Sequence, residues 1–291
     1  MTTAKLHIPK LPTSVIEPIV RRALQEDFGN SGDITANLLI PERASGALVM
    51  RARQSGVVAG LQAARLTYAL VDPDVKFEIK KDDGSLVKKG DILVAVKGST
   101  RSLLAAERIA LNFMGRMSGI ASLTQQYVKA VKGTKARIAA TRKTTPGLRA
   151  LEKQAVLCGG GFTHRESLSS AIMIKDNHIA LAGGIEAALK AITERADHMA
   201  RISVEVDTLT QLKKALPFKP DVILLDNMAP PTLKKAVAIR QGFDGPKPIL
   251  EASGGVNLST VAAIAKSGVD IISVGALTHS APNFDIGMDA D

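Results

Sequence analysis

The sequence predicts an α/β protein, with an incomplete βα barrel of six or seven parallel strands and a smaller α+β N-terminal domain. Three observations support this prediction. From residue 136 onward, short apolar runs alternate with helical stretches, as they do in repeated βα units on a parallel sheet. Each of these apolar runs ends in polar residues or glycine. Residues 46–100 show a different pattern, in which strand-like runs and turn residues replace the regular alternation of apolar runs and helical stretches.

The length of 291 residues is large for a single core, so one large domain or two unequal domains are expected. We place an α+β domain at 1–115 and the barrel at 116–279, with the tail 280–291 returning to the first domain. The apolar runs are far too short to cross a bilayer, and the N-terminus lacks the apolar segment of a signal peptide. We therefore expect a cytoplasmic protein without a membrane partner.

The N-terminal region begins with apolar residues at helical spacing over 14–26, followed by turn residues. Strand-like runs in 46–100 surround a tight turn near Gly84. Residues 103–132 form a long helical pattern that we expect to be interrupted near Gly115 to Gly119, where the chain passes into the second domain.

The barrel region contains six strand-like runs and five helical stretches. The predicted strands are 137–141, 171–175, 202–206, 222–226, 248–252 and 271–275, and the predicted helices are 147–158, 184–196, 208–216, 230–241 and 258–267. Six strands, with one more missed, favour a barrel over an open sheet. A dinucleotide-binding fold is disfavoured, because no Gly-x-Gly-x-x-Gly follows the first strand.

Polar side chains or glycine stand at the end of every predicted barrel strand. These residues are Arg142 and Lys143; Lys175, Asp176 and Asn177; Glu205 and Asp207; Asp226 and Asn227; Glu251 and Ser253; and Gly275. In a βα barrel the carboxyl ends of the strands converge on one mouth, where active sites lie. The alternative is that βα loops are polar because they face solvent. The agreement of six separate strands favours a site.

The positive charge of the chain is concentrated in one stretch. Residues 101–175 hold 13 Lys and Arg against three Glu, which equals the formal net charge of +10 for the whole chain. Local positive charge around a pocket attracts anionic substrates. Aromatic residues make up only 3% of the chain and Trp is absent, which leaves little material for stacking on bases. We therefore expect no nucleic-acid partner.

Four cations within that stretch, Arg142, Lys143, Arg165 and Lys175, predict a substrate with more than one anionic group. Glu205 and Asp226 are expected to lie across from these cations on successive strands, where they could bind Mg²⁺ or face a cationic transition state. The alternative for the two acids is a salt bridge with the basic residues.

Glycines near the C-terminus predict a phosphate site. Ser253, Gly254 and Gly255 follow one strand and Gly275 follows the next, where unshielded backbone N–H groups can hold a phosphate. Turns before helices also need glycine for conformational reasons alone, so both interpretations stay open for either pair.

The histidines and the single cysteine are less informative. His164 lies inside the cationic cluster, which favours contact with an anion, whereas His178 could equally contact the start of a helix, and His279 has no assigned role. Cys158 is expected to be a small residue at a helix end rather than a nucleophile. The sequence patterns of zinc sites are absent, so we expect no transition-metal site.

An ordered set of segments covers nearly the whole chain and resembles one enzyme family. The segments are EDFGNSGDIT (26–35), ERIALNFMGRMSGIA (107–121), TRKTTPGLRALEKQAVLCGGGFTHR (141–165), IKDNH (174–178), VEVD (204–207), LLDNM (224–228), EASGGV (251–256) and ISVGALTHSAP (272–282). They resemble the quinolinate phosphoribosyltransferases, also called nicotinate-nucleotide pyrophosphorylases (carboxylating).

This resemblance implies transfer of phosphoribose from 5-phosphoribosyl-1-pyrophosphate to quinolinate, giving nicotinate mononucleotide, pyrophosphate and CO₂ in NAD biosynthesis. It implies Mg²⁺ as cofactor and a homodimer with shared active sites, and leaves open assembly into a hexamer. The implied catalytic residues are Lys143, Lys175, Glu205 and Asp226, with the two acids facing the ribose hydroxyls and Mg²⁺. The implied substrate-binding residues are Arg142, His164, Arg165 and Lys175 for quinolinate, Arg108 from the neighbouring subunit, and Ser253, Gly254 and Gly275 for the 5-phosphate.

Three alternatives stay open at this point. A related phosphoribosyltransferase could act on another pyridine carboxylate and share the same motifs. A barrel lyase could use Lys143 or Lys175 as a Schiff base, which requires a neutral amine. A non-catalytic nucleic-acid binder would show strongly salt-dependent binding through the basic stretch.

Overall fold

The computed structural model describes residues 8–290; residues 1–7 and Asp291, at the ends of the predicted domain 1–115 and the predicted tail 280–291, lie outside the described residues. The contacts divide the chain into two compact units. Among the described residues, unit 1 comprises 8–125, 144–160 and 277–290, and unit 2 comprises 126–143 and 161–276. The chain therefore crosses between the units several times, and each unit is described by itself.

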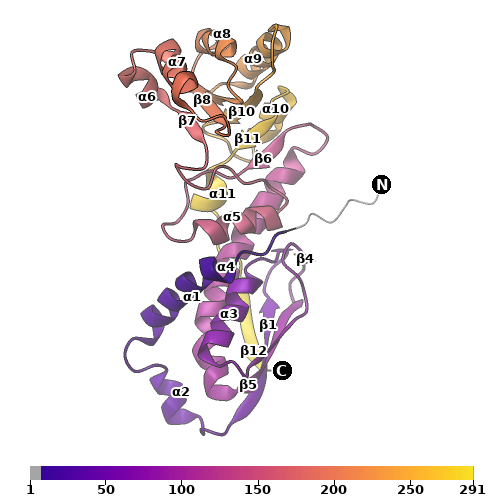
Figure 1. The fold of residues 1–291 in the computed structure, drawn as a ribbon. Coiled ribbons are helices and arrows are strands. Elements are labelled where there is room, and N and C mark those ends of the chain that lie inside the picture. Colours follow the sequence, from indigo (N-terminus) through magenta and orange to yellow (C-terminus); the bar gives the residue numbers. More distant parts are fainter. Residues whose placement is uncertain (1–7, 291) are drawn as a thin grey trace. The chain divides into compact units, whose positions relative to one another are not determined.

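Unit 1 contains antiparallel strands and the longest helix of the described chain (Figure 1). Its helices are α1 (Thr13–Phe28), α2 (Ile34–Leu39), α3 (Leu61–Val71), α4 (Thr100–Ala130), which runs on into unit 2, α5 (Arg149–Cys158) and α11 (Ala276–His279). Its strands are β1 (Ser45–Ala52), β2 (Gly56–Val57), β3 (Lys76–Ile79), β4 (Leu86–Val87), β5 (Ile92–Ser99) and β12 (Ile286–Ala290). Four strands form a sheet in the order β12-β1-β5-β3, and β2 pairs with β4.

The core of unit 1 lies between this sheet and helices α3 and α4. Met50, Val94, Leu103 and Met114 are among its fully buried side chains. The turn predicted near Gly84 is confirmed, since Gly84 has φ +84°. Cys158 is the last residue of α5 and is buried, as predicted for a small helix-end residue, and burial raises the pKa of its thiol.

Helix α4 runs without interruption, so the predicted break near Gly115 to Gly119 is wrong. The two glycines instead allow the C-terminal segment to lie directly against the helix. A Cβ atom on Gly119 would stand 2.0 Å from the carbonyl oxygen of Pro282. The backbone N–H of Phe284 donates to the carbonyl of Gly115 at 2.9 Å. Close backbone approach, rather than helix breaking, explains these glycines.

Helix α3 was not predicted, because residues 46–100 were interpreted as strands throughout. Leu61, Ala64 and Tyr68 are buried on one side of this helix, and their spacing of three and four residues was an available helical signal. The helix begins after Gly60, whose φ of +97° sets the entry angle of the chain. The short helices α2 and α11 were also not predicted.

Unit 2 is a six-stranded parallel sheet with helices between its strands (Figure 1). The strands β6 (Arg137–Ala139), β7 (Ile172–Ile174), β8 (Ile202–Val206), β9 (Val222–Asp226), β10 (Ile249–Ser253) and β11 (Ile271–Ser273) follow the order β6-β11-β10-β9-β8-β7. The helices are α6 (Asp176–Leu181), which was not predicted, α7 (Ile185–Arg195), α8 (Leu209–Ala215), η1 (Leu216–Phe218), α9 (Pro230–Gly242) and α10 (Val261–Lys266). A single parallel bridge joins Ala139 to Phe162 beside β6. The predicted incomplete barrel of six or seven strands is confirmed.

The two faces of this sheet differ in chemistry. Val204, Ile223 and Leu250 are completely buried and alternate along their strands with residues of the other face. On that other face lie the acids Glu205 and Glu251, which both align with Leu224 of β9. Aligned residues of neighbouring parallel strands point to the same side, so the acids share one face. No helix in residues 8–290 combines the length and the apolar character that crossing a membrane requires.

Candidate active site

The polar residues at the carboxyl ends of β8, β9 and β10 lie on one face of the sheet. Glu205 aligns with Leu224, two residues before Asp226, and Asp226 aligns with Ser253 of the next strand. Side chains two residues apart on a strand point to the same side. Glu205, Asp226 and Ser253 therefore face the same space, as the strand ends of a βα barrel require.

Lys175 and Glu205 form an ion pair at this edge. The Nζ atom of Lys175 donates to Oε2 of Glu205 at 2.9 Å, and the Glu205 side chain is only 10% exposed. The expectation that Glu205 would lie across from all four cations is wrong, because Lys175 follows β7 and β7 is the immediate neighbour of β8. A salt bridge with a basic residue, considered above as the alternative for Glu205, is present in the structure.

His164 contacts a buried acid rather than standing alone. Its Nδ1 atom accepts a hydrogen bond from the backbone N–H of Arg165 at 2.9 Å, which assigns the ring proton to Nε2. Nε2 lies 3.5 Å from Oε1 of Glu251, which is 5% exposed. Burial raises the pKa of Glu251; a hydrogen bond with Ser273 opposes this effect and the charge of Glu205 adds to it.

Two arginines bring positive charge close together. The guanidinium of Arg165 donates to the carbonyl of Ala171 at 2.9 Å, which fixes its direction. Burial lowers the pKa of Arg165, and the positive charge of Arg142 lowers it further. Since a bound anion relieves such repulsion, this pair suits recognition of a carboxylate or phosphate.

The turns after β9 and β10 are interlocked. Asn227, with φ +52°, donates from its backbone N–H to the carbonyl of Ser253 and from its side chain to Oδ2 of Asp226, at 2.9 and 2.7 Å. Gly254 has φ +88°, and a Cβ atom there would stand 2.1 Å from Oδ1 of Asn227. Glycine is therefore required at 254. Asn227, which the sequence placed at a strand end without assigning it a role, orients the carboxylate of Asp226. Its place directly after Asp226 at a strand end was the available signal.

The remaining predicted site residues have separate surroundings. Lys143 is exposed beyond β6, and its backbone N–H donates to Oγ1 of Thr141 at 3.0 Å. Gly275 directly precedes α11. The Nδ1 atom of His178 accepts from the backbone N–H of Lys175 at 3.0 Å, which is a contact at the start of α6. Arg108 belongs to unit 1, where it is exposed on α4.

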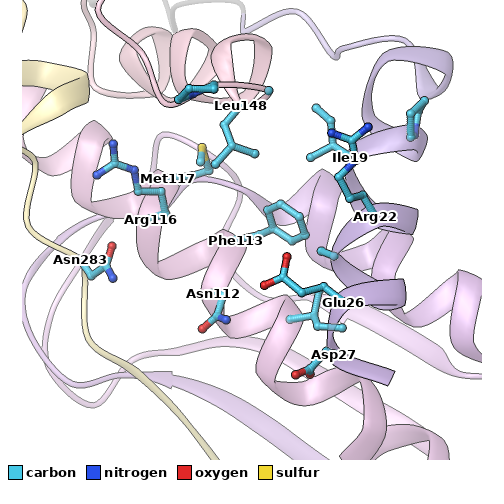
Figure 2. Close-up of a pocket in the computed structure, with 15 residues that line it drawn as sticks. Ile19, Arg22, Glu26, Asp27, Asn112, Phe113, Arg116, Met117, Leu148 and Asn283 are labelled. Atoms are coloured by element: carbon cyan, nitrogen blue, oxygen red, sulfur yellow. The ribbon is translucent and has the colours of Figure 1, made fainter. Parts of the chain in front are cut away.

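Unit 1 contains a cavity of about 730 Å³ that the sequence did not predict. Its lining comes from α1, α4, the turn before α5 and the C-terminal segment, with Arg22 and Glu26 on α1 and Arg116 on α4 (Figure 2). None of the predicted site residues lines it. In Figure 2 Arg116 points towards the C-terminal segment that carries Asn283, away from the residues of α1.

Comparison with known proteins gives one consistent result. The model described as quinolinate phosphoribosyl transferase, N-terminal domain, matches residues 33–118, and the model of the C-terminal domain of the same family matches residues 120–289. The nicotinate-nucleotide pyrophosphorylase [carboxylating] of Mycobacterium leprae is 43% identical over 273 residues, which are 93% of this chain and 95% of that protein. A probable nicotinate-nucleotide pyrophosphorylase [carboxylating] of Bacillus subtilis is 39% identical over 94% of this chain and 93% of its own length.

The fold agrees with these relatives. The crystal structure of NadC from Streptococcus pyogenes matches with a TM-score of 0.92 and 36% identity, and covers 97% of this chain and 98% of that chain. Both family models, the relatives and the solved structure extend over the two units and the strand-end residues. The chain belongs to the quinolinate phosphoribosyl transferase family.

Proposed function

We propose that this protein transfers the phosphoribosyl group of 5-phosphoribosyl-1-pyrophosphate to the ring nitrogen of quinolinate and releases pyrophosphate, CO₂ and nicotinate mononucleotide in NAD biosynthesis. The names of its relatives describe the same reaction from the product side, as a carboxylating pyrophosphorolysis. The observation that carries the proposal is the shared face of Glu205, Asp226 and Ser253, with Lys175 paired to Glu205, in a member of this family.

The cations are assigned to the anionic groups of the two substrates. Arg142, His164, Arg165 and Lys175 hold the carboxylates of quinolinate, and Lys143 and Lys175 face the pyrophosphate. The fixed direction of the Arg165 guanidinium supports this assignment, because forked recognition of a carboxylate needs an oriented arginine.

The glycine turns are assigned to the 5-phosphate of the ribose. Ser253, Gly254 and Gly275 surround it with backbone N–H groups. The left-handed backbone of Gly254 and its contact with Asn227 support a preformed cradle, in which N–H groups need no rearrangement to meet an anion.

The reaction needs no protein nucleophile. The lone pair of the quinolinate nitrogen forms the new bond to C1 of the ribose while the bond from C1 to pyrophosphate breaks, and the departing oxygen keeps the electron pair. C1 gains positive charge during this step, which the carboxylates of Glu205 and Asp226 stabilise, while Lys143 and Lys175 stabilise the leaving pyrophosphate. Substrate positioning supplies much of the remaining acceleration.

Decarboxylation follows from the new bond. The alkylated ring nitrogen is a cation, so it stabilises the electron pair left on ring carbon 2 when the carboxylate departs as CO₂. A proton from solvent then adds to that carbon. The positive charges of Arg142 and Arg165 orient the carboxylates without being consumed.

Mg²⁺ is proposed to enter with the phosphoribosyl pyrophosphate. Mg²⁺ in phosphate sites is held by one or two carboxylates together with substrate phosphates and water. Glu205 and Asp226 fit this requirement, because both face the same space from neighbouring strands and Asn227 holds Asp226 in a fixed direction. The ion, when bound, neutralises charge on the pyrophosphate.

The oligomer and the cellular location are also proposals. A homodimer with shared active sites would bring Arg108 of one subunit to the quinolinate of the other, and the exposure of Arg108 on α4 is compatible with this role. A hexamer built from such dimers stays open. The cytoplasmic location stays a prediction from the sequence.

The test is direct product measurement. Purified protein receives phosphoribosyl pyrophosphate and Mg²⁺ with either quinolinate or nicotinate, and release of pyrophosphate and nicotinate mononucleotide is followed. We expect product from quinolinate only. Turnover of nicotinate would favour the related enzyme with another pyridine carboxylate, and absence of any product would overturn the proposal.

A matched pair of lysine variants sharpens this test. Lys175→Met should lower kcat/KM by about 100-fold or more, because it removes a cation from the developing charge. Lys190→Met changes an exposed lysine of α7 and should leave kcat/KM unchanged. Equal effects of the two substitutions would contradict the assignment.

The Schiff-base alternative is disfavoured at Lys175 by one contact. A Schiff-base lysine must present a neutral amine, whereas the ammonium of Lys175 is paired with Glu205 at 2.9 Å. Borohydride trapping with a carbonyl substrate tests the alternative, and formation of a stable adduct at Lys143 or Lys175 would revive it.

A further inference from the structure

An ion pair between a half-buried arginine and a fully buried glutamate joins α4 and α5 within unit 1. Glu152 of α5 is 0% exposed, and its Oε1 atom accepts two hydrogen bonds from Arg116 of α4, from Nη2 at 2.7 Å and from Nε at 3.1 Å. Neither residue belongs to the substrate-binding set proposed above. A carboxylate buried to this degree is costly unless all its partners are in place.

Both members of this pair also hold loop backbone. The second oxygen of Glu152, Oε2, accepts from the backbone N–H of Thr145 at 3.1 Å. Arg116 donates to the carbonyl of Thr278, to the carbonyl of Ala281 at 3.2 Å and to the hydroxyl of Thr145 at 3.4 Å. Two segments that are far apart in the sequence, the turn before α5 and the end of α11 with the residues that follow it, thus form hydrogen bonds with one pair of side chains.

Each of these segments follows a proposed site residue closely in the sequence. Thr145 is two residues after Lys143, which is assigned to the pyrophosphate. Thr278 is three residues after Gly275, which is assigned to the 5-phosphate. A few residues of backbone leave little freedom between an anchor point and the group that it positions.

We propose that Arg116 and Glu152 are positioning residues for the phosphoribosyl transfer, because their ion pair fixes the anchor points of the two segments that carry Lys143 and Gly275. This inference rests on the proposed function of those two residues. Neither Arg116 nor Glu152 touches the reacting atoms.

A purely structural role would not require charges here. A buried ion pair is often no more stable than a well-packed apolar pair of similar volume. An apolar pair, however, cannot accept from Thr145 or donate to the carbonyls of Thr278 and Ala281. The ion pair therefore differs from an apolar pair in its hydrogen bonds, and these bonds fix the backbone positions of Thr145, Thr278 and Ala281. A displacement of about 1 Å at a reacting group can lower a rate by about 100-fold.

The experiment replaces the ion pair by an apolar pair. In the full-length protein, Arg116→Met combined with Glu152→Leu keeps the volume and removes every hydrogen bond to the loops. We expect the thermal midpoint to change little, kcat/KM with quinolinate to fall by about 100-fold, and amide hydrogen exchange to become faster in 144–148 and 277–281. Glu152→Gln keeps two hydrogen-bonding groups at this position and should recover part of the activity.

A second ion pair, between a buried arginine and a half-buried aspartate, supplies the control. Arg240 and Asp270 of unit 2 are joined at 2.9 Å, and Arg240 also donates to the carbonyl of Pro248, at the amino ends of β10 and β11. Arg240→Met combined with Asp270→Leu should likewise change the thermal midpoint little, and should leave kcat/KM and the KM for both substrates within about twofold, since these contacts lie away from the strand ends that carry the site.

Several results would overturn the inference. Unchanged kcat/KM and unchanged exchange in the Arg116 and Glu152 double variant would do so. An activity loss that the Arg240 and Asp270 control variant shows to the same degree would also overturn the inference. If the double variant does not fold, Arg116→Lys and Glu152→Gln are measured by the same readouts, with the same expected direction.

A failure of the proposed function is distinguished by two readouts that need no turnover. If the wild-type protein forms no product from quinolinate, the proposed reaction falls, but hydrogen exchange and titration with inorganic pyrophosphate still decide the inference. Faster exchange in both loops together with at least about tenfold weaker pyrophosphate binding in the double variant would support it. Unaltered exchange and unaltered binding would overturn it.

Discussion

Replacing Asp83 by Asn should stabilise the protein at neutral pH. Asp83 lies in the turn before β4, and its Oδ1 atom accepts from the backbone N–H of Leu61 at the start of α3, at 3.2 Å. Burial raises the pKa of Asp83 from 3.8 to about 6; the N–H of Leu61 opposes this effect, the charge of Asp82 adds to it, and the N–H of Gly60 opposes it. The ionised carboxylate is therefore disfavoured in the folded protein.

The sign and the size of the effect follow from this pKa. The folded protein holds its proton more tightly than the unfolded chain, so stability is greatest below the unfolded pKa and falls as pH rises towards about 6. A shift of about two units corresponds to at most about 3 kcal/mol, at about 1.4 kcal/mol per unit. Asn keeps an oxygen that can accept from Leu61 and carries no charge, so the variant avoids this loss.

The assay is urea unfolding of the wild type and the Asp83→Asn variant, followed by far-UV circular dichroism between about pH 4 and about pH 8. We expect the two proteins to be equally stable near about pH 4, and the variant to gain stability relative to the wild type up to about pH 7. Asp82→Asn removes the exposed neighbouring charge and serves as control, with a much smaller effect. A stability difference that does not change with pH, or a variant less stable at high pH, would refute the reasoning.

Two further predictions concern the site. Gly254→Ala should raise KM for phosphoribosyl pyrophosphate by about tenfold or more, since the new Cβ meets Asn227 and disfavours the left-handed backbone. Steady-state kinetics measure this KM. Gly255→Ala is the control and should have a smaller effect, because Gly255 has φ +59° but nothing lies within 4 Å of the new Cβ. Mixing Arg108→Ala subunits with Lys175→Ala subunits should restore part of the activity if sites are shared between subunits. No recovery in confirmed mixed dimers would contradict shared sites.

The repeating part of the fold could be predicted because its signals are local. Apolar runs bounded by turn residues gave all six strands of the parallel sheet, and the long helix over 103–132 corresponds to α4. The expected break at Gly115 and Gly119 failed because the reason for these glycines lies far away in the sequence, at Pro282 and Phe284. Sequence spacing alone cannot distinguish a glycine that ends a helix from one that admits another backbone.

In the candidate site, too, features with a local sequence signal could be predicted and features that join distant residues could not. The polar strand ends could be predicted because every parallel strand delivers its carboxyl end to one edge of the sheet. The order of the strands could not be predicted, so Lys175 was expected opposite Glu205 although it lies beside it. The pairing of Arg116 with Glu152 joins residues 36 positions apart, and no local pattern marks it.

The pairing of β12 with β1 affects the order in which the chain can fold during synthesis. Leu48 of β1 aligns with Ala290 of β12, so β1 lacks its partner on this edge of the sheet until β12, which follows all of unit 2 in the sequence, has been made. Residues 161–276 of unit 2 are complete before that point. Unit 1 at that stage still lacks an edge strand and the segment around Pro282 and Phe284 that lies against Gly115 and Gly119 of α4. An unpaired strand edge invites association with other chains. Nascent or prematurely ended chains should therefore depend on chaperones mainly through unit 1.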